Sequence, residues 1–199
     1  MAYANSSKWV EKLEQEGELL RVREPACVEL EIAAAADQES KSGHGGKALL
    51  FESPVRRDGT AYGFPVLING YGSAKRIAMA LGREKVEEIG DEVGALVKAK
   101  PPAGLSEAWD LLKKGLELRH ARPVSVGRGE CQEVVHRAED GGEGLAKIPV
   151  LKTWPKDGGP FLTLPQVITE DPETHERNVG MYRIQVLGPW EAALHWQLH

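Results

Sequence analysis

The sequence predicts an α/β (α+β) protein, with an N-terminal α/β domain at residues 1–122 and an antiparallel β domain at residues 123–199. Three observations lead to this fold class. Apolar strand-like segments alternate with amphipathic helical segments as far as about His120. From about Val124, short strand-like pieces separated by glycine-rich turns replace the helices. Beyond Phe161, three apolar runs follow one another with only turns between them, as in an antiparallel sheet.

The segment SSKWVEKLEQEG predicts the first helix, because its apolar residues Trp9 and Leu13 lie one turn apart. Ser6 or Ser7 is the expected N-cap, since a hydroxyl can accept a hydrogen bond from a free N–H of the first turn. Gly17 is expected to end the helix.

The rest of the N-terminal half continues the alternation. Ser73 is the expected N-cap of the helix SAKRIAMAL, and Gly82 its end. The run FPVLING is apolar throughout, which indicates a buried strand. We expect strands at 18–26, 47–55 and 64–70, and helices at 30–46, 73–82, 84–100 and 105–120.

The C-terminal half ends in three predicted strands, at residues 161–170, 177–187 and 191–199. The acidic turn around Pro172 separates the first two, and GPW separates the last two. Because the sequence stops on the strand-like run ALHWQLH, we expect the chain to be a truncated piece of a longer protein.

Composition excludes several classes of function. The formal net charge of −5 gives no reason to expect nucleic acid or an anionic membrane as a partner. No apolar run approaches the roughly 20 residues that a membrane span needs, and residues 1–20 lack the apolar region that a signal peptide would have. Cys27 and Cys131 form neither a disulfide framework nor a metal knuckle, so we expect two reduced thiols in a cytoplasmic protein.

The final strands contain candidate metal ligands, namely Asn178, His195 and His199. An asparagine and a histidine with a carboxylate would suit Mn²⁺ or Mg²⁺ better than a structural zinc ion. An isolated histidine at a strand end is more often a surface residue or a satisfied core residue, so spacing leaves both interpretations open.

Arg183 stands among apolar neighbours in RNVGMYRIQVL, which predicts a partly buried guanidinium that needs an anionic partner. That partner is either a structural carboxylate or a ligand carboxylate or phosphate. The preceding segment KTWPKDGGPFLTLP predicts a rigid, wide turn that could pack a flat cofactor. Thr163 follows it among apolar residues, where its hydroxyl would need a partner. The glycines of GYGSAKR and GHGGK match no phosphate-binding motif and indicate a helix cap and a flexible loop.

The segment IPVLKTWPKDGGPFLTLPQVITEDPETHERNVGMYRIQVL, followed by HWQLH, resembles the central motif of the UbiD-type decarboxylases. LEQEGELLRV, ALLFESP and FPVLINGYGSAKRIAMALG occur earlier in the same order as in that family. The resemblance spans nearly the whole chain. It implies that the β domain is the first part of a split β-barrel of flavin-reductase type. It also implies a reversible decarboxylase of aromatic, heteroaromatic or α,β-unsaturated carboxylic acids, acting through a covalent adduct with prenylated FMN.

The resemblance assigns roles to particular residues. Asn178 and His199 resemble the metal ligands of the family, and His195 fits that role less well. Arg183 resembles the arginine that lies against the substrate carboxylate and is the candidate catalytic residue. The candidate cofactor-binding residues are Thr163, Val179, Gly180, Met181, Tyr182, Arg183, Gln197 and Leu198.

The resemblance further implies Mn²⁺ (or Mg²⁺) and K⁺ as ions, a flavin prenyltransferase that supplies the cofactor, and a homo-oligomeric complete enzyme. The family's third metal ligand and its catalytic glutamates lie later in the chain than residue 199. We therefore expect the 199 residues alone to be inactive. Two alternatives remain, a non-catalytic flavin-binding module on the same barrel and a flavin reductase of split-barrel type.

The two site residues of RNVGMYRIQVL impose a geometric condition. Asn178 and Arg183 are five residues apart, so a regular strand would point them to opposite faces. Both can reach one pocket only if Asn178 lies in the preceding turn or the strand bulges, with Gly180 the expected position of the bulge.

Overall fold

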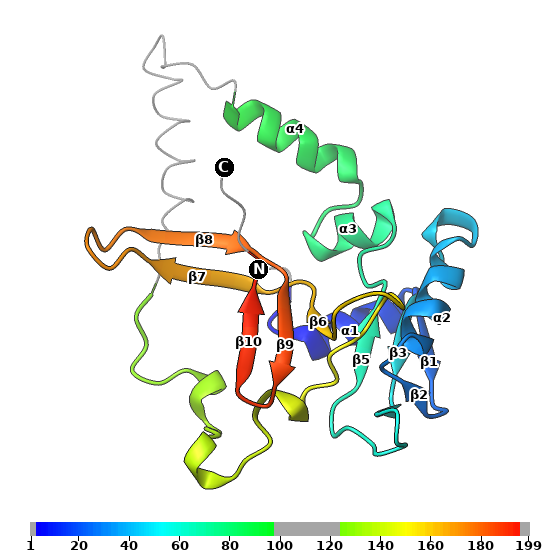
Figure 1. The fold of residues 1–199 in the computed structure, drawn as a ribbon. Helices are drawn as coiled ribbons and strands as arrows, with labels where there is room; N and C mark the ends of the chain where they lie inside the picture. Colours follow the sequence, from blue (N-terminus) through cyan, green and yellow to red (C-terminus); the bar gives the residue numbers. More distant parts are fainter. Residues whose placement is uncertain (1–2, 98–123, 196–199) are drawn as a thin grey trace. The chain divides into compact units, whose positions relative to one another are not determined.

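The structure is a computed structural model that describes residues 3–97 and 124–195 (Figure 1). Helices and strands are mixed, as predicted. The described residues fall into two compact units, one formed by 3–85 with 136–195 and the other by 86–97 with 124–135. The expected domain boundary between residues 122 and 123 lies outside the described residues and stays a prediction, as does the predicted helix at 105–120.

A three-stranded sheet forms the centre of the N-terminal half. Its order is β1 (Leu19–Val22), β3 (Ala48–Phe51), β5 (Val66–Ile68), with β3 parallel to β1 and antiparallel to β5. The parallel pair needs a crossover connection, and α2 (Glu31–Ser40) lies within it. All four residues of β3 are buried, which is why its sequence ALLF is uniformly apolar.

Helix α1 (Ser6–Gln15) packs Trp9 and Leu13 against Ala48 of the sheet. Its N-cap is Asn5, whose Oδ1 accepts a hydrogen bond from Lys8 N at 3.0 Å. The expectation of Ser6 or Ser7 is therefore wrong by one or two residues, since the amide oxygen one position earlier meets the same need.

Helix α3 (Ala74–Ala80) begins at the predicted cap, because the Ser73 side chain accepts from Arg76 N. Arg76 itself is fully buried. Its Nη1 donates to Glu18 Oε2 at 3.0 Å and to Gly46 O at 2.5 Å, and its Nη2 donates to Gly45 O at 3.2 Å. One guanidinium thus joins α3, the start of β1 and the glycine-rich loop that contains the 3₁₀ helix η1 (Gly43–Gly45).

The second unit contains α4 (Val86–Val97), which confirms the predicted helix there, and the 3₁₀ helix η3 (Glu130–Gln132). The strand-like pieces expected between 124 and 150 are wrong. The structure has short 3₁₀ turns there, including η4 (Ala138–Asp140) and η5 (Gly144–Lys147). Glycines with positive φ, such as Gly141 at 68°, interrupt the extended conformation.

Five short strands replace the three long ones predicted after Phe161. They are β6 (Phe161–Leu162), β7 (Gln166–Glu170), β8 (Arg177–Met181), β9 (Ile184–Gly188) and β10 (Glu191–Leu194). They form a β7–β8 hairpin and a separate sheet of order β10-β9-β6 (Figure 1). Pro165 lies at the break between β6 and β7, where it has no N–H to donate. The described strands form no closed barrel, and the split-barrel arrangement stays a prediction.

The loop before β6 contacts the N-terminal segment that carries β2 (Ala26–Cys27), which itself pairs with β4 (Pro54–Val55). Lys152 N donates to Val28 O at 3.1 Å, and Leu30 N donates to Lys152 O at 2.9 Å. Leu30 has φ 70° and ψ −37°, and Glu31 N bonds Glu29 O across it, so it is the centre of a strained three-residue turn.

The β7–β8 turn is organised by Asp171. Its Oδ1 accepts hydrogen bonds from Glu173 N at 2.8 Å and Thr174 N at 2.7 Å. The N–H of Thr174, followed by that of Glu173, lowers the pKa of Asp171 below its ordinary value of 3.8.

This lowered pKa predicts an acid-sensitive hairpin. The stabilisation that the ionised Asp171 carboxylate gives to the turn is fully present above its ordinary pKa. It is lost as pH falls through the lowered pKa. Amide exchange of β7 and β8, followed by NMR, should accelerate below about pH 4 relative to β9 and β10. In Asp171→Asn the amide oxygen keeps its acceptor role at every pH, so this extra acceleration should disappear. Equal acid sensitivity in both proteins would contradict the assignment.

Candidate functional site

The predicted strand 177–187 is divided between two sheets. β8 pairs with β7, β9 pairs with β6 and β10, and Tyr182 and Arg183 lie between them. The continuous ladder that would separate Asn178 from Arg183 is thus not observed. The expected position of the irregularity is wrong, however. Gly180 pairs with Val167 and Asn178 with Thr169 in an unbroken register, so the chain departs from the ladder two residues after Gly180.

One face of the hairpin carries Asn178, Gly180 and Tyr182. Asn178 Nδ2 donates to Tyr182 Oη at 3.4 Å. A Cβ added at Gly180 would lie 2.5 Å from Tyr182 Cε2, so the phenol ring lies directly over this glycine. A side chain at position 180 therefore leaves no room for the Tyr182 ring in this position, and the contact places the Tyr182 hydroxyl beside the candidate metal ligand.

Gly180→Ala should displace the Tyr182 ring with little loss of stability. The ring is only half-buried, so it can swing away, and we expect the free energy of unfolding to fall by less than about 1 kcal/mol. The hydrogen bond from Asn178 should be lost, which the NMR signals of the Asn178 amide and the Tyr182 ring would report. Gly188→Ala is the matched control, since its Cβ would meet nothing closer than 3.9 Å. Unchanged Tyr182 signals in Gly180→Ala would contradict the geometry.

The opposite face of the hairpin carries Val179 and Met181, with Ile168 beside them on β7. These three side chains are 51%, 70% and 64% exposed. Alternation along β8 therefore splits the predicted cofactor-binding residues between two faces. Gly180 and Tyr182 accompany Asn178, whereas Val179 and Met181 form an exposed apolar strip.

Arg183 is exposed, so the expectation of a partly buried guanidinium is wrong. Its Cζ lies 4.2 Å from the centroid of the Phe161 ring, a cation–π contact between the break and β6. No carboxylate within residues 3–97 or 124–195 forms an ion pair with it. The guanidinium is thus oriented by an aromatic ring and remains open to an anion from solution.

Thr163 is also exposed, which corrects the expectation that its hydroxyl needs a protein partner. His195 contributes its backbone, with N donating to Arg183 O at 3.2 Å. Gln197, Leu198 and His199 lie outside the described residues. Of the three candidate metal ligands, the structure thus describes Asn178 and His195, the one that fits the role less well, whereas His199 lies outside the described residues. The part of the chain that it describes contains no cluster of three His, Cys, Asp or Glu side chains suited to a metal.

The loop predicted to pack a flat group has hydrogen bonds of its own. Asp157 Oδ2 accepts from Trp154 N at 3.2 Å and from Thr153 Oγ1 at 3.3 Å. Trp154 is 69% exposed and borders a cavity of about 490 Å³ against the alanines of α2. Gln185 packs against Gly158 and Gly159, where added Cβ atoms would approach its Nε2 to 3.1 and 3.2 Å.

No described helix is long and apolar enough to cross a membrane. Comparison with known families gives two matches. Residues 10–93 match the 3-octaprenyl-4-hydroxybenzoate carboxy-lyase N-terminal domain, and residues 122–199 match the Rift-related domain of the same family. Uncharacterized proteins from Aquifex aeolicus and Archaeoglobus fulgidus are 45% and 41% identical over 197 and 202 residues. These alignments cover 99% and 100% of this chain but only 39% and 38% of the relatives, so the chain spans about two fifths of their length.

Solved structures show the same relationship. The UbiD-class enzyme HmfF from Pelotomaculum thermopropionicum in complex with FMN has a TM-score of 0.69 at 26% identity, covering 97% of this chain and 37% of that one. Vanillic acid decarboxylase from Sedimentibacter hydroxybenzoicus has a TM-score of 0.71 at 26% identity, covering 96% and 36%. With consecutive family domains matched across most of its length and with this shared fold, the chain belongs to the UbiD family and corresponds to its N-terminal portion.

Proposed function

We propose that the chain is the N-terminal part of a carboxy-lyase that reversibly decarboxylates aromatic, heteroaromatic or α,β-unsaturated acids with prenylated FMN. The main support for this proposal is that the solved structures with the same fold are UbiD-class enzymes. HmfF binds FMN and, in an evolved form, prFMN, and a second neighbour is a vanillic acid decarboxylase. Family membership supports a decarboxylase, and the cofactor and substrate class follow from these relatives by analogy.

The described residues fit a flavin better than they fit a metal ion. The exposed strip of Ile168, Val179 and Met181 offers apolar area for a planar ring, and Arg183, two residues after Met181, offers a cation. We propose that Thr163, Val179–Arg183, Gln197 and Leu198 bind the cofactor. Asn178 supplies a single hard oxygen ligand, and we propose that it holds Mn²⁺ or Mg²⁺ together with His199, with K⁺ at the cofactor phosphate.

Arg183 is the residue that we propose to hold the substrate. Its planar guanidinium can bind a carboxylate through two parallel hydrogen bonds. The Phe161 ring beneath it, 4.2 Å away, limits the orientations that the guanidinium can adopt. Loss of CO₂ from an sp² carbon leaves charge that no side chain can absorb, and the prenylated flavin, when bound, supplies that electron sink.

The remaining partners follow from the same proposal. A flavin prenyltransferase would supply the cofactor, and the complete enzyme would be a cytoplasmic homo-oligomer. A second candidate function is a non-catalytic flavin-binding module, since an apolar strip can bind a ring without any chemistry. The two differ in whether bound flavin leads to release of CO₂.

A chimera separates these functions. This chain would replace the matching 197 residues of the Aquifex aeolicus relative, with which it is 45% identical. Both proteins would be co-expressed with a flavin prenyltransferase, supplied with Mn²⁺, and assayed for CO₂ release from a panel of aryl and acrylic acids.

We expect the chimera and the unmodified relative to decarboxylate the same acids. The 199 residues alone should release none, because their described part provides one metal ligand and no acidic partner for Arg183. A chimera that binds flavin but releases no CO₂, beside an active relative, would support the non-catalytic module. CO₂ release by the 199 residues alone would overturn the expectation of inactivity.

A further inference from the structure

Tyr182 lies where the chain leaves β8 for β9, and its side chain lies back along β8. A Cβ built at Gly180 would lie 2.5, 2.8 and 2.9 Å from Cε2, Cζ and Oη of Tyr182. The ring and its hydroxyl therefore fill the space that a side chain at position 180 would need. Because residues two apart on a strand share a face, the phenol covers the face of β8 that also carries Asn178.

The phenol oxygen reaches the amide of Asn178, since Asn178 Nδ2 donates to Tyr182 Oη at 3.4 Å. The backbone is held on both sides of this contact. Asn178 pairs with Thr169 in the ladder of β7 and β8, and His195 N donates to the carbonyl of Arg183, the residue after Tyr182, at 3.2 Å. The freedom that remains is rotation of the exposed Asn178 side chain, which the hydroxyl of Tyr182 limits.

The direction of this hydrogen bond matters for a metal ligand. An asparagine binds a hard cation through its carbonyl oxygen, because its amide N–H groups would present positive hydrogen atoms to the ion. When Nδ2 of Asn178 donates to Tyr182 Oη, the amide turns its Oδ1 away from the phenol. Metal-binding side chains are commonly oriented in this way, by a hydrogen bond from the atom that does not bind the ion.

We propose that Tyr182 is a positioning residue for the divalent ion. Its hydroxyl accepts the amide N–H of Asn178 and so holds Asn178 Oδ1 in the orientation that binds Mn²⁺ or Mg²⁺. This role rests on the proposed function, in which Asn178 is a metal ligand, and adds to it a residue that does not touch the ion. Glycine at position 180 belongs to the same arrangement, since a methyl group there would occupy the place of the ring.

The test measures Mn²⁺ affinity in the chimera, co-expressed with the flavin prenyltransferase. Metal is removed with EDTA, and the protein is titrated with Mn²⁺ while the EPR signal of free Mn²⁺ is followed. The affinity is referred to the amount of flavin bound, measured by its absorbance. Tyr182→Phe keeps the ring and removes only the hydroxyl. We expect it to weaken Mn²⁺ binding about tenfold, the lower end of the range for a residue that orients a metal ligand.

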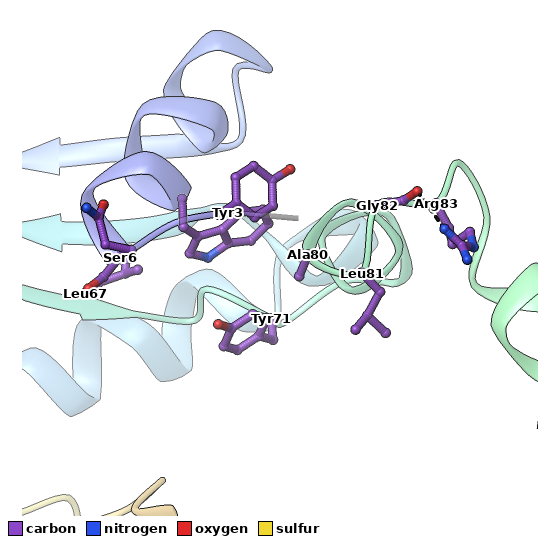
Figure 2. Close-up of a pocket in the computed structure, with 10 residues that line it drawn as sticks. Tyr3, Ser6, Leu67, Tyr71, Ala80, Leu81, Gly82 and Arg83 are labelled. Atoms are coloured by element: carbon purple, nitrogen blue, oxygen red, sulfur yellow. Dashed lines mark hydrogen bonds between the residues drawn. The ribbon is translucent and has the colours of Figure 1, made fainter. Parts of the chain in front are cut away.

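Tyr71→Phe is the matched control. Figure 2 shows Tyr71 at a cavity in the N-terminal half, whose described lining residues all precede Lys85. Tyr71 is 54% exposed, so the variant removes a tyrosine hydroxyl at little cost to the fold, and Mn²⁺ affinity should stay unchanged. Asn178→Ala removes the ligand itself and should weaken binding more than Tyr182→Phe does.

Gly180→Ala gives a second route to the same loss. Its methyl group displaces the phenol from Asn178, so Mn²⁺ affinity should fall as far as in Tyr182→Phe. In the double variant the hydroxyl is already absent, and the methyl group should cause no further loss. Such non-additivity is expected of two changes that act through one hydrogen bond, and it separates the hydroxyl from the packing of the ring.

Three results would overturn the role of Tyr182. They are unchanged Mn²⁺ affinity in Tyr182→Phe, an equal loss in Tyr71→Phe, and additive losses in the double variant. A loss in Tyr182→Phe as large as that in Asn178→Ala would make the tyrosine a ligand and would also count against positioning.

The same titrations separate this role from the proposed metal site. If the chimera binds no Mn²⁺, or if Asn178→Ala keeps full affinity, the proposed ligand is wrong and the role of Tyr182 falls with it. A loss in Asn178→Ala with none in Tyr182→Phe would remove the role of Tyr182 alone.

Discussion

Arg76→Met is expected to lower the free energy of unfolding by about 3–5 kcal/mol, the range for removing one partner of a buried ion pair. Arg76 is fully buried, and its guanidinium donates hydrogen bonds to Glu18 and to two backbone carbonyls of the glycine-rich loop. Its loss removes this donor from Gly46 O, leaves Gly45 O with Asn69 Nδ2 at 3.0 Å, and leaves the Glu18 carboxylate with only Lys75, at 2.9 Å. Urea denaturation followed by circular dichroism measures the change.

Two further variants make this test specific. Arg76→Lys keeps the charge but cannot reach all three acceptors, so its loss should be intermediate. Arg23→Met removes a side chain that is 81% exposed and has one ion pair at 3.8 Å, so its effect should stay within about 0.5 kcal/mol. A loss below about 1 kcal/mol in Arg76→Met would mean that the loop is not held by this residue.

The ion pairs of Glu18 with Lys75 and Arg76 also make the stability of the fold depend on pH. Burial alone would raise the pKa of Glu18, but hydrogen bonds from Lys75 and Arg76 outweigh it, and the pKa is lowered from its ordinary value of 4.5. The stabilisation is thus complete above the ordinary pKa and is lost as pH falls through the lowered one. Arg76→Met should reduce this acid-dependent part of the stability.

Arg183→Leu in the chimera is expected to reduce kcat/KM for decarboxylation about 100- to 1000-fold, as for loss of one preorganised electrostatic contact at a reacting group. The guanidinium is exposed, so the fold should tolerate the change. Because Arg183 is also a proposed cofactor-binding residue, kcat/KM is referred to the amount of flavin bound in each variant, measured by its absorbance, which separates loss of substrate contact from loss of cofactor. Steady-state kinetics with the best acid of the panel gives the value.

Arg177→Leu is the matched control for this experiment. Arg177 is an exposed arginine at the start of the same strand, opposite Glu170, and should affect kcat/KM less than about twofold. Arg183→Lys should lie between the two, because it keeps the charge but loses the two-pronged hydrogen bond. Activity in Arg183→Leu equal to that in Arg177→Leu would remove Arg183 from the catalytic proposal.

Local signals predicted the N-terminal elements well. The cap at Ser73 needs one hydroxyl and one N–H three residues away, and the turn at Gly17 needs a positive φ of 68°, so neighbouring residues decide both. The family was also predictable, since a long ordered motif carries more information than any single residue, and the domain matches confirm it.

Features that depend on distant residues were not predictable in this way. In SAKRIAMAL, Arg76 looks like a solvent-facing residue, and its burial depends on Glu18, 58 positions earlier. Arg183 was expected to be partly buried because its neighbours are apolar. Its exposure follows from the change of sheet at Tyr182 and Arg183, which only strand pairing reveals. The same pairing decides which of the predicted cofactor residues share a face of β8.

The strained turn at Leu30 has a consequence for the order of folding during synthesis. The N–H of Leu30 donates to the carbonyl of Lys152. Lys152 lies 123 positions after Glu29, the residue just before Leu30. At about 5–20 residues per second, the ribosome delivers that carbonyl roughly 6 to 25 s after Leu30 itself. Until then the N–H of Leu30 has only water as an acceptor, and the Lys152 contact cannot yet hold the turn at positive φ, whereas the β1–β3 pairing can already form. Formation of the hydrogen bond between Leu30 and Lys152 is therefore a late event in the synthesis of this chain.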